Sequence, residues 1–203
     1  MSDPDWEKDS PRLRKNLRQA LLLTLTEASR REKPTLEAAR EWQRLIMRDL
    51  SVPNARYVGA FRGEAGLENL QVRVGANYGV ASADVAKELA LFEAKLQSIV
   101  AELDGLLPVG HEPDADELAA IVDVCAWAHA EWVRIHPFAN GNGRTARLWA
   151  NSLALRYGLP PFVRLLPRPN VGYAEAGAKA MRGDWEPTAA AFRTLLEDFL
   201  KGS

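Results

Sequence analysis

Residues 136–147 read His-Pro-Phe-Ala-Asn-Gly-Asn-Gly-Arg-Thr-Ala-Arg, a histidine followed by a glycine-rich turn and two arginines. Gly141 and Gly143 can adopt positive φ without a Cβ clash, so consecutive backbone N–H groups of the turn can point into one concavity. A helix that begins directly after the turn adds unpaired N–H groups and the positive end of its dipole. Arg144 and Arg147 are three residues apart, so they share one helix face and can bind the same anion.

His136 stands at the start of this segment, and its imidazole can take up a proton near neutral pH. The segment therefore predicts a phosphate-binding loop with a general base beside it. Residues 141–144 alone also fit a simpler interpretation, in which the glycines form a turn, the arginines are solvated and His136 is a hydrogen-bonded loop residue. A P-loop is excluded, because no lysine followed by a hydroxyl residue comes after the second glycine.

The complete segment resembles the signature of the Fic family, H-P-F-x-[D/E]-G-N-G-R-x-x-R, at every fixed position except residue 140. Residues 127–135 resemble the helix that leads into the family motif, and residues 148–161 resemble the following helix with its Gly-Leu-Pro-Pro exit. The resemblance covers roughly residues 55 to 200. It implies a mostly all-α fold, a Fic-like helical bundle with a small β-hairpin flap over the active-site loop.

The resemblance also implies an activity, transfer of AMP from ATP to a Ser, Thr or Tyr hydroxyl of a target protein with release of pyrophosphate. In this interpretation His136 is the general base, and Pro137 and Phe138 anchor the loop. Backbone N–H groups and the Asn142 side chain stabilise charge on the reacting phosphate. The implied phosphate-binding residues are Asn140, Gly141, Asn142, Gly143, Arg144 and Arg147, and the implied neighbours of the nucleotide are Asn151 and Tyr173. For Tyr173, packing against its neighbours is an equally good interpretation.

Asn140 is the departure from the family pattern, which carries Asp or Glu at this position and uses it to hold Mg²⁺ on the nucleotide phosphates. An asparagine carbonyl can still coordinate Mg²⁺, but it brings no negative charge, so the expected metal affinity is lower. ATP as substrate, Mg²⁺ as cofactor and Asn140 as a weakened metal ligand are therefore the expectations that the resemblance implies.

Composition describes one ordinary globular chain. The 203 residues can bury a proper core, and 47% are hydrophobic and 26% charged. The resemblance divides them into an N-terminal helical extension, residues 1–54, and a Fic domain, residues 55–203.

A net charge of −1 gives no sign of attraction to nucleic acid or to an anionic membrane. The single cysteine, Cys125, excludes an intramolecular disulfide and is expected to be buried. Without an 18-residue apolar run or a signal peptide, the expected compartment is the cytoplasm, with export by a dedicated secretion machine left open.

Helix signals occupy most of the chain. Apolar periodicity, capping residues and the positions of glycine and proline predict helices from residue 10 onward and over residues 35–50, 82–103, 116–134, 143–157, 173–181 and 185–200. Residues 58–63 and 70–75 are short and glycine-bounded, and residues 71–74 alternate polar and apolar as in a half-exposed strand, so the two segments predict the strands of a hairpin. The resemblance makes this hairpin the flap, with target-binding residues Val72, Arg73, Val74 and Gly75. A hairpin that binds no substrate remains the alternative.

Three further questions follow from the resemblance. His129 has no second ligand at helical spacing, which favours a packed, hydrogen-bonded histidine over a metal ligand.

Many family members are inhibited by a glutamate in an [S/T]-x-x-x-E-[G/N] motif, which pairs with the second motif arginine, and this chain contains no such motif. If inhibition occurs, a separate antitoxin-like protein is the expected source. The alternatives to AMP transfer are transfer of UMP, phosphate or phosphocholine, and a module that binds nucleotide or protein without catalysis.

Overall fold

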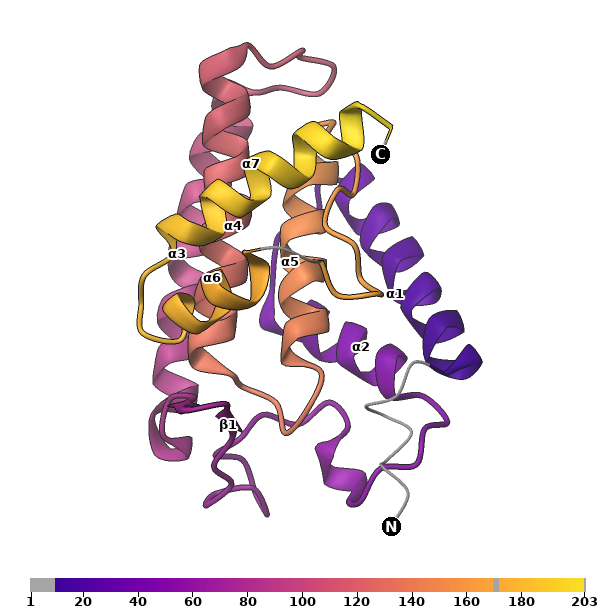
Figure 1. The fold of residues 1–203 in the computed structure, drawn as a ribbon, viewed down its shortest axis with the longest axis vertical. Helices are drawn as coiled ribbons and strands as arrows, with labels where there is room; N and C mark the ends of the chain where they lie inside the picture. The colour runs from indigo at the N-terminus through magenta and orange to yellow at the C-terminus, as the bar shows by residue number, and fades with distance from the viewer. Residues whose placement is uncertain (1–9, 170–171, 203) are drawn as a thin grey trace.

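The computed structural model describes residues 10–169 and 172–202, and these form helices and one small hairpin (Figure 1). The α-helices are α1 (Pro11–Ser29), α2 (Leu36–Met47), α3 (Val85–Leu106), α4 (Ala115–Ile135), α5 (Asn142–Arg156), α6 (Tyr173–Ala180) and α7 (Glu186–Leu200). The strands are β1 (Arg73–Val74) and β2 (Asn77–Tyr78), and two 3₁₀ turns cover Ala55–Tyr57 and Ser82–Asp84. The predicted class, mostly all-α with a small β-hairpin, is confirmed.

Capping residues explain where the helices begin. The Ser10 side chain caps α1, which has Pro11 in its first turn, and Thr35 caps α2. Asp114 and Glu117 form a capping box at the start of α4. These side chains satisfy N–H groups that have no carbonyl one turn back. Across the described residues, no helix has the length and apolar character needed to span a membrane.

Helices α4 and α5 form the centre of the fold (Figure 1). They run antiparallel and are joined by a turn at residues 136–141, which lies at the same end of the molecule as the hairpin. Helices α1 and α2 pack on α5, while α3 and α7 pack on α4. This arrangement carries the glycine-rich turn on two buried helices, which is the rigid support that a functional loop requires.

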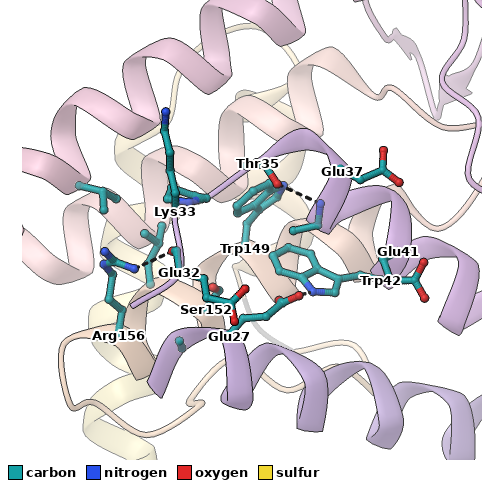
Figure 2. A pocket seen from close by; sticks show the side chains of 15 residues that line it. Glu27, Glu32, Lys33, Thr35, Glu37, Glu41, Trp42, Trp149, Ser152 and Arg156 are labelled. Carbon is teal, nitrogen blue, oxygen red and sulfur yellow. Dashed lines mark hydrogen bonds between the residues drawn. The ribbon is translucent and has the colours of Figure 1, made fainter. Parts of the chain in front are cut away.

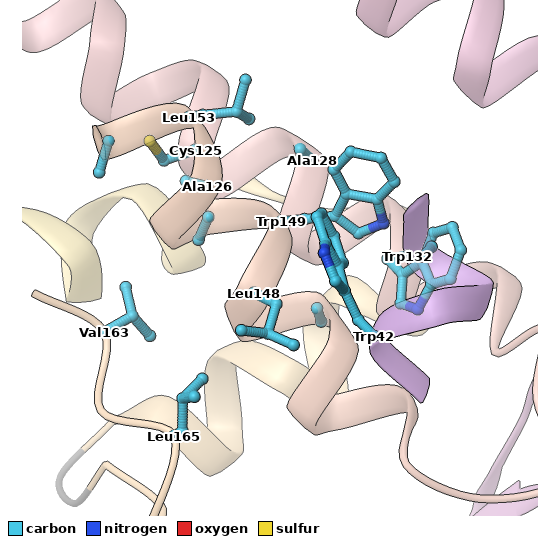
Figure 3. Close-up of a cluster of buried hydrophobic side chains, with 14 of the residues drawn as sticks. Trp42, Cys125, Ala126, Ala128, Trp132, Leu148, Trp149, Leu153, Val163 and Leu165 are labelled. Atoms are coloured by element: carbon cyan, nitrogen blue, oxygen red, sulfur yellow. The ribbon is translucent and has the colours of Figure 1, made fainter. Parts of the chain in front are cut away.

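An aromatic cluster holds these helices together (Figure 3). Trp149 of α5 lies 4.8 Å from Trp42 of α2, 5.7 Å from Trp132 of α4 and 5.6 Å from Phe92 of α3, measured between ring centroids. All four side chains are almost completely buried. Truncating one such side chain to alanine typically lowers stability by about 3–5 kcal/mol. Cys125 lies in the same core and is fully buried, as predicted.

The segment predicted as an N-terminal extension shares this core. The Asn16 amide of α1 donates to the carbonyls of Ile46 and Arg48 at the end of α2, at 3.1 and 2.7 Å. Trp42 of α2 then packs directly on Trp149 of α5. Helices α1 and α2 therefore pack in the same core as the other helices. The division of the chain into an extension and a domain near residue 54 stays a prediction made from the sequence.

The predicted strand positions were wrong in part. Residues 58–63 form no strand, and Phe61 makes only an isolated bridge to Phe138. The hairpin instead closes locally, with Arg73 opposite Tyr78 and Val74 opposite Asn77. Pattern alone could not show this, because the polar side chain at position 62 points into the protein interior and satisfies backbone carbonyls there. A side chain used in this way replaces the hydrogen bonds that a second strand would supply.

Candidate functional site

A cavity of about 600 Å³ lies where the α4–α5 turn, the hairpin and α6 meet. Its lining consists of residues 72–77, His129, Val133, His136, residues 139–144, Arg147, Arg168, Tyr173, Ala174, Gly177, Ala178 and Met181. The structure therefore places the predicted base, the glycine-rich turn, both motif arginines and the predicted target-binding residues 72–75 around one space. These segments are far apart in the sequence, so the fold creates this grouping.

His136 ends α4 in a conformation that exposes one ring nitrogen. Its backbone is left-handed, with φ 53° and ψ 55°, and its N–H still donates to the carbonyl of Trp132 at 3.0 Å. Its Nδ1 lies 3.0 Å from the carbonyl oxygen of Val133. Because a carbonyl only accepts, Nδ1 carries the proton and Nε2 keeps its lone pair.

Burial lowers the pKa of His136, the hydrogen bond to Val133 opposes that shift, and the positive charge of Arg62 adds to it. The imidazole is therefore neutral at pH 7. A neutral ring with Nε2 unprotonated is the form that a general base needs.

The side chains at positions 137, 138 and 142 anchor the turn. The Phe138 ring is fully buried, 4.8 Å from the ring of Phe61 and 5.9 Å from that of Trp132. The Pro137 carbonyl accepts the N–H of Arg62 at 2.7 Å. The Asn142 amide accepts from the N–H of Phe138 and donates to its carbonyl, both at 2.8 Å.

The anchoring role predicted for Pro137 and Phe138 fits this geometry. The expected contact of the Asn142 side chain with phosphate does not fit this geometry, because both polar atoms of the amide bond to the backbone of Phe138.

The two glycines play different roles. Gly141 has φ 87° and precedes the first residue of α5, and a Cβ there would approach Met47 Cε at 2.9 Å. Gly143 has no positive φ and lies in the first turn of α5, which corrects the expectation that both glycines adopt left-handed conformations. The N–H groups of Asn142 and Gly143 have no carbonyl one turn back in α5. They provide the positive end of the helix at the cavity wall.

Arg147 is a buried cation whose protein partners are neutral. Its side chain is 4% exposed, its Nη1 donates to the Tyr173 hydroxyl at 3.2 Å, and its Nη2 donates to the Leu165 carbonyl at 2.9 Å. Within residues 10–169 and 172–202, no carboxylate lies within ion-pair distance of it. Burying a charge without a counter-ion is unfavourable, so this guanidinium is suited to binding an anion from outside the protein.

The charge around the cavity has one sign. Arg144 lies one helical turn before Arg147, and Arg73 and Arg168 also reach the lining. The described lining residues include no Asp or Glu. An anionic ligand is therefore attracted by four guanidinium groups and by a helix N-terminus. Sequence reasoning missed Arg168, although its position between Pro167 and Pro169 marks a stiff segment that can hold a side chain in place.

His129 and Tyr173 form a neutral pair behind Arg147. Their Nε2 and hydroxyl oxygen are 2.7 Å apart, and the same hydroxyl accepts from Arg147. The hydroxyl proton therefore points to His129. Burial, followed by the charge of Arg147, lowers the pKa of His129 to about 3, so this ring stays neutral. The predicted packed, hydrogen-bonded histidine is confirmed, and both expectations for Tyr173 fit, because it packs on His129 and also lines the cavity.

Asn151 does not reach the cavity. Its amide donates to the Val163 carbonyl at 2.8 Å and accepts the Val163 N–H at 3.1 Å, and its side chain is buried. It holds the connector after α5 in place. The expected contact with a nucleotide is therefore not found, because two hydrogen bonds to the backbone already satisfy this amide.

The residues at the cavity do not form a protein-held Mg²⁺ site. Mg²⁺ prefers oxygen ligands that include one or two carboxylates. The described lining has none, and Asn140 Oδ1 already accepts the N–H of Gly141. Elsewhere in the described chain, too, no group of three or more His, Cys, Asp or Glu side chains comes together. Asn140 as a metal ligand therefore stays a prediction that this geometry does not support.

A second cavity, of about 250 Å³, lies beside the other end of α5 and is lined by different residues (Figure 2). Glutamates from α1, α2 and the loop between them surround it, but their carboxylates have protein partners. Glu27 accepts from the indole N–H of Trp42 at 2.9 Å, and Glu37 and Glu41 both pair with Arg44. The buried guanidinium whose protein partners are neutral, that of Arg147, therefore lies in the first cavity, which is the candidate site.

The sequence model of the Fic/DOC family matches residues 33–154, more than half of the chain. The protein adenylyltransferase Fic of Drosophila melanogaster is 52% identical over 42 residues, which are 21% of this chain and 8% of that protein. The protein of the same name from Nematostella vectensis is 40% identical over 72 residues, 35% of this chain and 16% of that protein. The chain thus spans only a small part of the length of these relatives.

Solved structures show the same fold. A Fic domain containing signaling protein from Bacteroides thetaiotaomicron superposes with a TM-score of 0.61 at 21% identity, covering 91% of this chain and 68% of that one. The BepC protein of Bartonella tribocorum, solved with bound AMPPNP, gives 0.59 at 16% identity, covering 95% and 90%. Such identities establish the likeness of fold alone. Together with the family match over residues 33–154, they show that this chain belongs to the Fic/DOC family.

Proposed function

We propose that this chain is a protein adenylyltransferase, which moves AMP from ATP to the hydroxyl of a Ser, Thr or Tyr side chain on a target protein. The observation that carries the proposal is the position of a neutral histidine, His136, on the same cavity as two motif arginines and the N-terminus of α5. A base and an anion site at one cavity match the two needs of this reaction. The matched relatives named protein adenylyltransferase Fic support the choice of AMP.

The chemical step follows from these positions. The target hydroxyl gives its proton to His136 Nε2 as its oxygen bonds to the α-phosphorus of ATP. The bond from that phosphorus to the bridging oxygen breaks, and pyrophosphate leaves. Arg144 and Arg147 hold the β- and γ-phosphates, so that the leaving group is fixed opposite the incoming hydroxyl. The free N–H groups at the start of α5 stabilise the negative charge on the α-phosphate.

The hairpin provides the place for the target. Residues 72–75 line the cavity and are largely exposed, and β1 pairs with β2 on one edge only. An extended target segment can add to the free edge as a further strand, which would bring its hydroxyl side chain toward His136. The exposed guanidinium of Arg73 can then contact carbonyls or acidic side chains of that segment.

Inhibition by a separate protein is part of the same proposal. Arg147 has no carboxylate partner in the part of the chain that the structure describes. An antitoxin-like partner that inserts a glutamate at Arg147 would satisfy this buried charge and exclude the γ-phosphate of ATP. The matched proteins do not identify such a partner for this chain.

Labelled ATP distinguishes the proposal from its alternatives. The protein is incubated with candidate target proteins and ATP labelled at either the α- or the γ-phosphate. AMP transfer predicts label on protein from α-labelled ATP only. Label from γ-labelled ATP would show phosphate transfer, and label from neither, with ATP bound, would show a binding module. Parallel incubation with UTP and CDP-choline tests the remaining donors, and transfer from one of those alone would reject AMP.

A further inference from the structure

Arg62 is a buried arginine that sequence reasoning did not single out. Its side chain is 1% exposed and donates to four backbone carbonyl oxygens. Nε donates to His136 at 2.7 Å and Nη1 to Leu70 at 3.2 Å, while Nη2 donates to Val80 at 2.7 Å and to Ile135 at 2.9 Å. No carboxylate within the described ranges pairs with it. Four of the five N–H donors of this guanidinium are therefore used on the backbone.

The four carbonyls belong to two functional parts of the site. Ile135 and His136 form the end of α4, where free carbonyls carry the negative end of the helix dipole and attract a cation. Leu70 precedes β1 and Val80 follows β2, so these two carbonyls lie at the two ends of the hairpin segment. One guanidinium thus connects the backbone of the proposed base to both ends of the proposed target-binding hairpin.

Gly79 shows how closely the hairpin approaches His136. A Cβ at this glycine would lie 2.7 Å from His136 Cβ and 3.0 Å from Arg62 Nη2. The N–H of Gly79 also donates to the Val72 carbonyl at 3.1 Å and so closes the base of the hairpin. The returning chain therefore touches the histidine and the guanidinium at one point, and a displacement of either part displaces the other.

His136 needs this support because of its backbone. It has positive φ without being a glycine, a conformation that is sparsely populated unless the surroundings hold it. Across the described residues, three hydrogen bonds restrain the two peptide units that flank His136: its N–H donates to Trp132, the Ile135 carbonyl accepts from Arg62 Nη2, and its own carbonyl accepts from Arg62 Nε. Two of these three come from Arg62.

We propose that Arg62 is a positioning residue, which holds His136 with its Nε2 toward the cavity and fixes the hairpin at the distance that a target hydroxyl requires. Its effect on transfer rests on the proposed function, whereas its effect on the histidine and hairpin does not. Arg62 touches neither ATP nor target, so it acts on the rate through His136 and the hairpin. Small displacements of this kind can lower a rate by about a hundredfold.

The test compares Arg62→Met and Arg62→Lys with Arg40→Met as a matched control. Arg40 supports the same segment, because it donates to the Gly59 carbonyl at 2.7 Å, pairs with Glu64 and lies over the Phe61 ring. Among the described residues, its hydrogen bonds, ion pairs and ring contact reach Gly59, Glu64, Glu37 and Phe61 but neither His136 nor the hairpin. Lysine at position 62 keeps the charge but cannot bond four carbonyls in forked geometry. It therefore gives an intermediate result even if Arg62→Met fails to fold.

The first readout is the tautomer of His136, measured from the ¹⁵N chemical shifts of its ring at a pH of about 8, where the imidazole is neutral. The chain has three histidines, so His111→Gln and His136→Gln variants assign the signals. Wild-type protein is expected to show Nδ1–H, as the bond to Val133 requires. Arg62→Met is expected to shift the ring toward the Nε2–H form that free imidazole prefers, while Arg40→Met leaves it unchanged.

The second readout is amide exchange of Gly79, which is expected to be about tenfold or more faster in Arg62→Met than in the control, since the hairpin base opens locally. The third is a comparison of kcat with the affinity for ATP. We expect Arg62→Met to lower kcat by about a hundredfold and Arg62→Lys by about tenfold, with ATP binding unchanged because Arg144 and Arg147 are untouched.

The outcomes separate the two proposals. The role of Arg62 is overturned if the folded Arg62→Met variant keeps the wild-type tautomer of His136 and the wild-type exchange rate of Gly79. Where methionine prevents folding, the same result in Arg62→Lys decides. This holds even if AMP transfer by the wild-type protein is established. If both signals change but wild-type protein transfers no AMP, the role of Arg62 in positioning is supported and the proposed function is rejected. Equal changes in the Arg40→Met control would also overturn the inference, because they would show general loosening.

Discussion

The cavity at the α4–α5 turn and the cavity between α1, α2 and α5 differ in their charged side chains and in how those charges are satisfied. The cavity at the α4–α5 turn is lined by four arginines and, among its described residues, by no carboxylate. The cavity between α1, α2 and α5 is surrounded by glutamates that accept from an indole or pair with arginines of the protein (Figure 2). A charged side chain with a protein partner contributes to structure, whereas a buried charge without one is available to a ligand.

The same contrast explains why the buried side chains of Arg147 and Glu27 differ in their need for a charged partner. Arg147 is held by a hydroxyl and a carbonyl, neither of which removes its charge. The pKa of Glu27 is raised mainly by burial, against the hydrogen bond from Trp42, with nearby Glu32 and Glu41 adding to the rise. Protonation or a neutral substitute can therefore satisfy the glutamate, but a guanidinium stays charged and requires an anion. This difference can be tested directly.

Replacing His136 by alanine gives the largest expected effect. Removing a positioned base typically lowers a rate by 10²–10⁴-fold, so we expect a loss on the order of a thousandfold in AMP transfer. ATP should still bind, because the arginines and the start of α5 are unchanged. Rates are measured with α-labelled ATP, and ATP affinity by calorimetry. Transfer that persists at the wild-type rate would reject His136 as the base.

Arg147→Met and Glu27→Gln form a pair that tests the comparison between the two cavities. Losing a charge-assisted hydrogen bond costs about 1.5–3 kcal/mol, so Arg147→Met should weaken ATP binding by about 10- to 100-fold. Glu27→Gln can still accept from Trp42 and should leave ATP affinity unchanged. Calorimetric titration of both variants with ATP provides the measurement. Equal loss of affinity in the two would show that the cavities are not functionally distinct.

The sequence predicted the helices and the contiguous part of the site well, for a physical reason. Caps, apolar periodicity and glycine position are local signals, and residues 136–147 lie on one turn and one helix. The register of that segment alone fixes the relation between His136, Gly141, Arg144 and Arg147. Such arrangements need no knowledge of tertiary contacts. The conformation of Gly143 and the partners of the Asn140 and Asn142 side chains differed from expectation, and the roles of the other residues in catalysis stay predictions.

The remaining part of the site depends on contacts between distant segments. Arg62 bonds to residues more than seventy positions away. Arg168 reaches the cavity after the connector that follows α5 has turned back along that helix, where Val163 bonds to Asn151. Asn151 lies on α5 like the motif arginines, yet it faces that connector. A helix has several buried faces in a compact bundle, and periodicity does not tell which of them borders a cavity. The strands were misplaced because the Arg62 side chain bonds to distant backbone carbonyls, and the local sequence pattern does not reveal such contacts.

Stability should fall in acid because of His129. Its pKa of about 3 in the folded protein lies below the unfolded value of about 6.5, so protonation favours the unfolded state as the pH falls below about 6.5. At pH 5 the loss is about 2 kcal/mol relative to neutral pH, and His136, whose pKa burial also lowers, adds to it.

Chemical denaturation at pH 7 and at pH 5 measures this loss. His129→Gln keeps an acceptor for Tyr173 and should show a smaller acid loss than wild type. Identical pH dependence in wild type and His129→Gln would contradict the assignment of His129 as a neutral buried partner of Tyr173.

Asn140→Asp gives the smallest expected effect and brings a carboxylate into the arginine-lined cavity. A carboxylate at this position would supply the ligand type that Mg²⁺ prefers and that the described lining lacks. We expect half-maximal activity at a severalfold lower Mg²⁺ concentration, with little change in the maximal rate. An unchanged Mg²⁺ titration in Asn140→Asp would show that position 140 is not where a metal would meet the nucleotide.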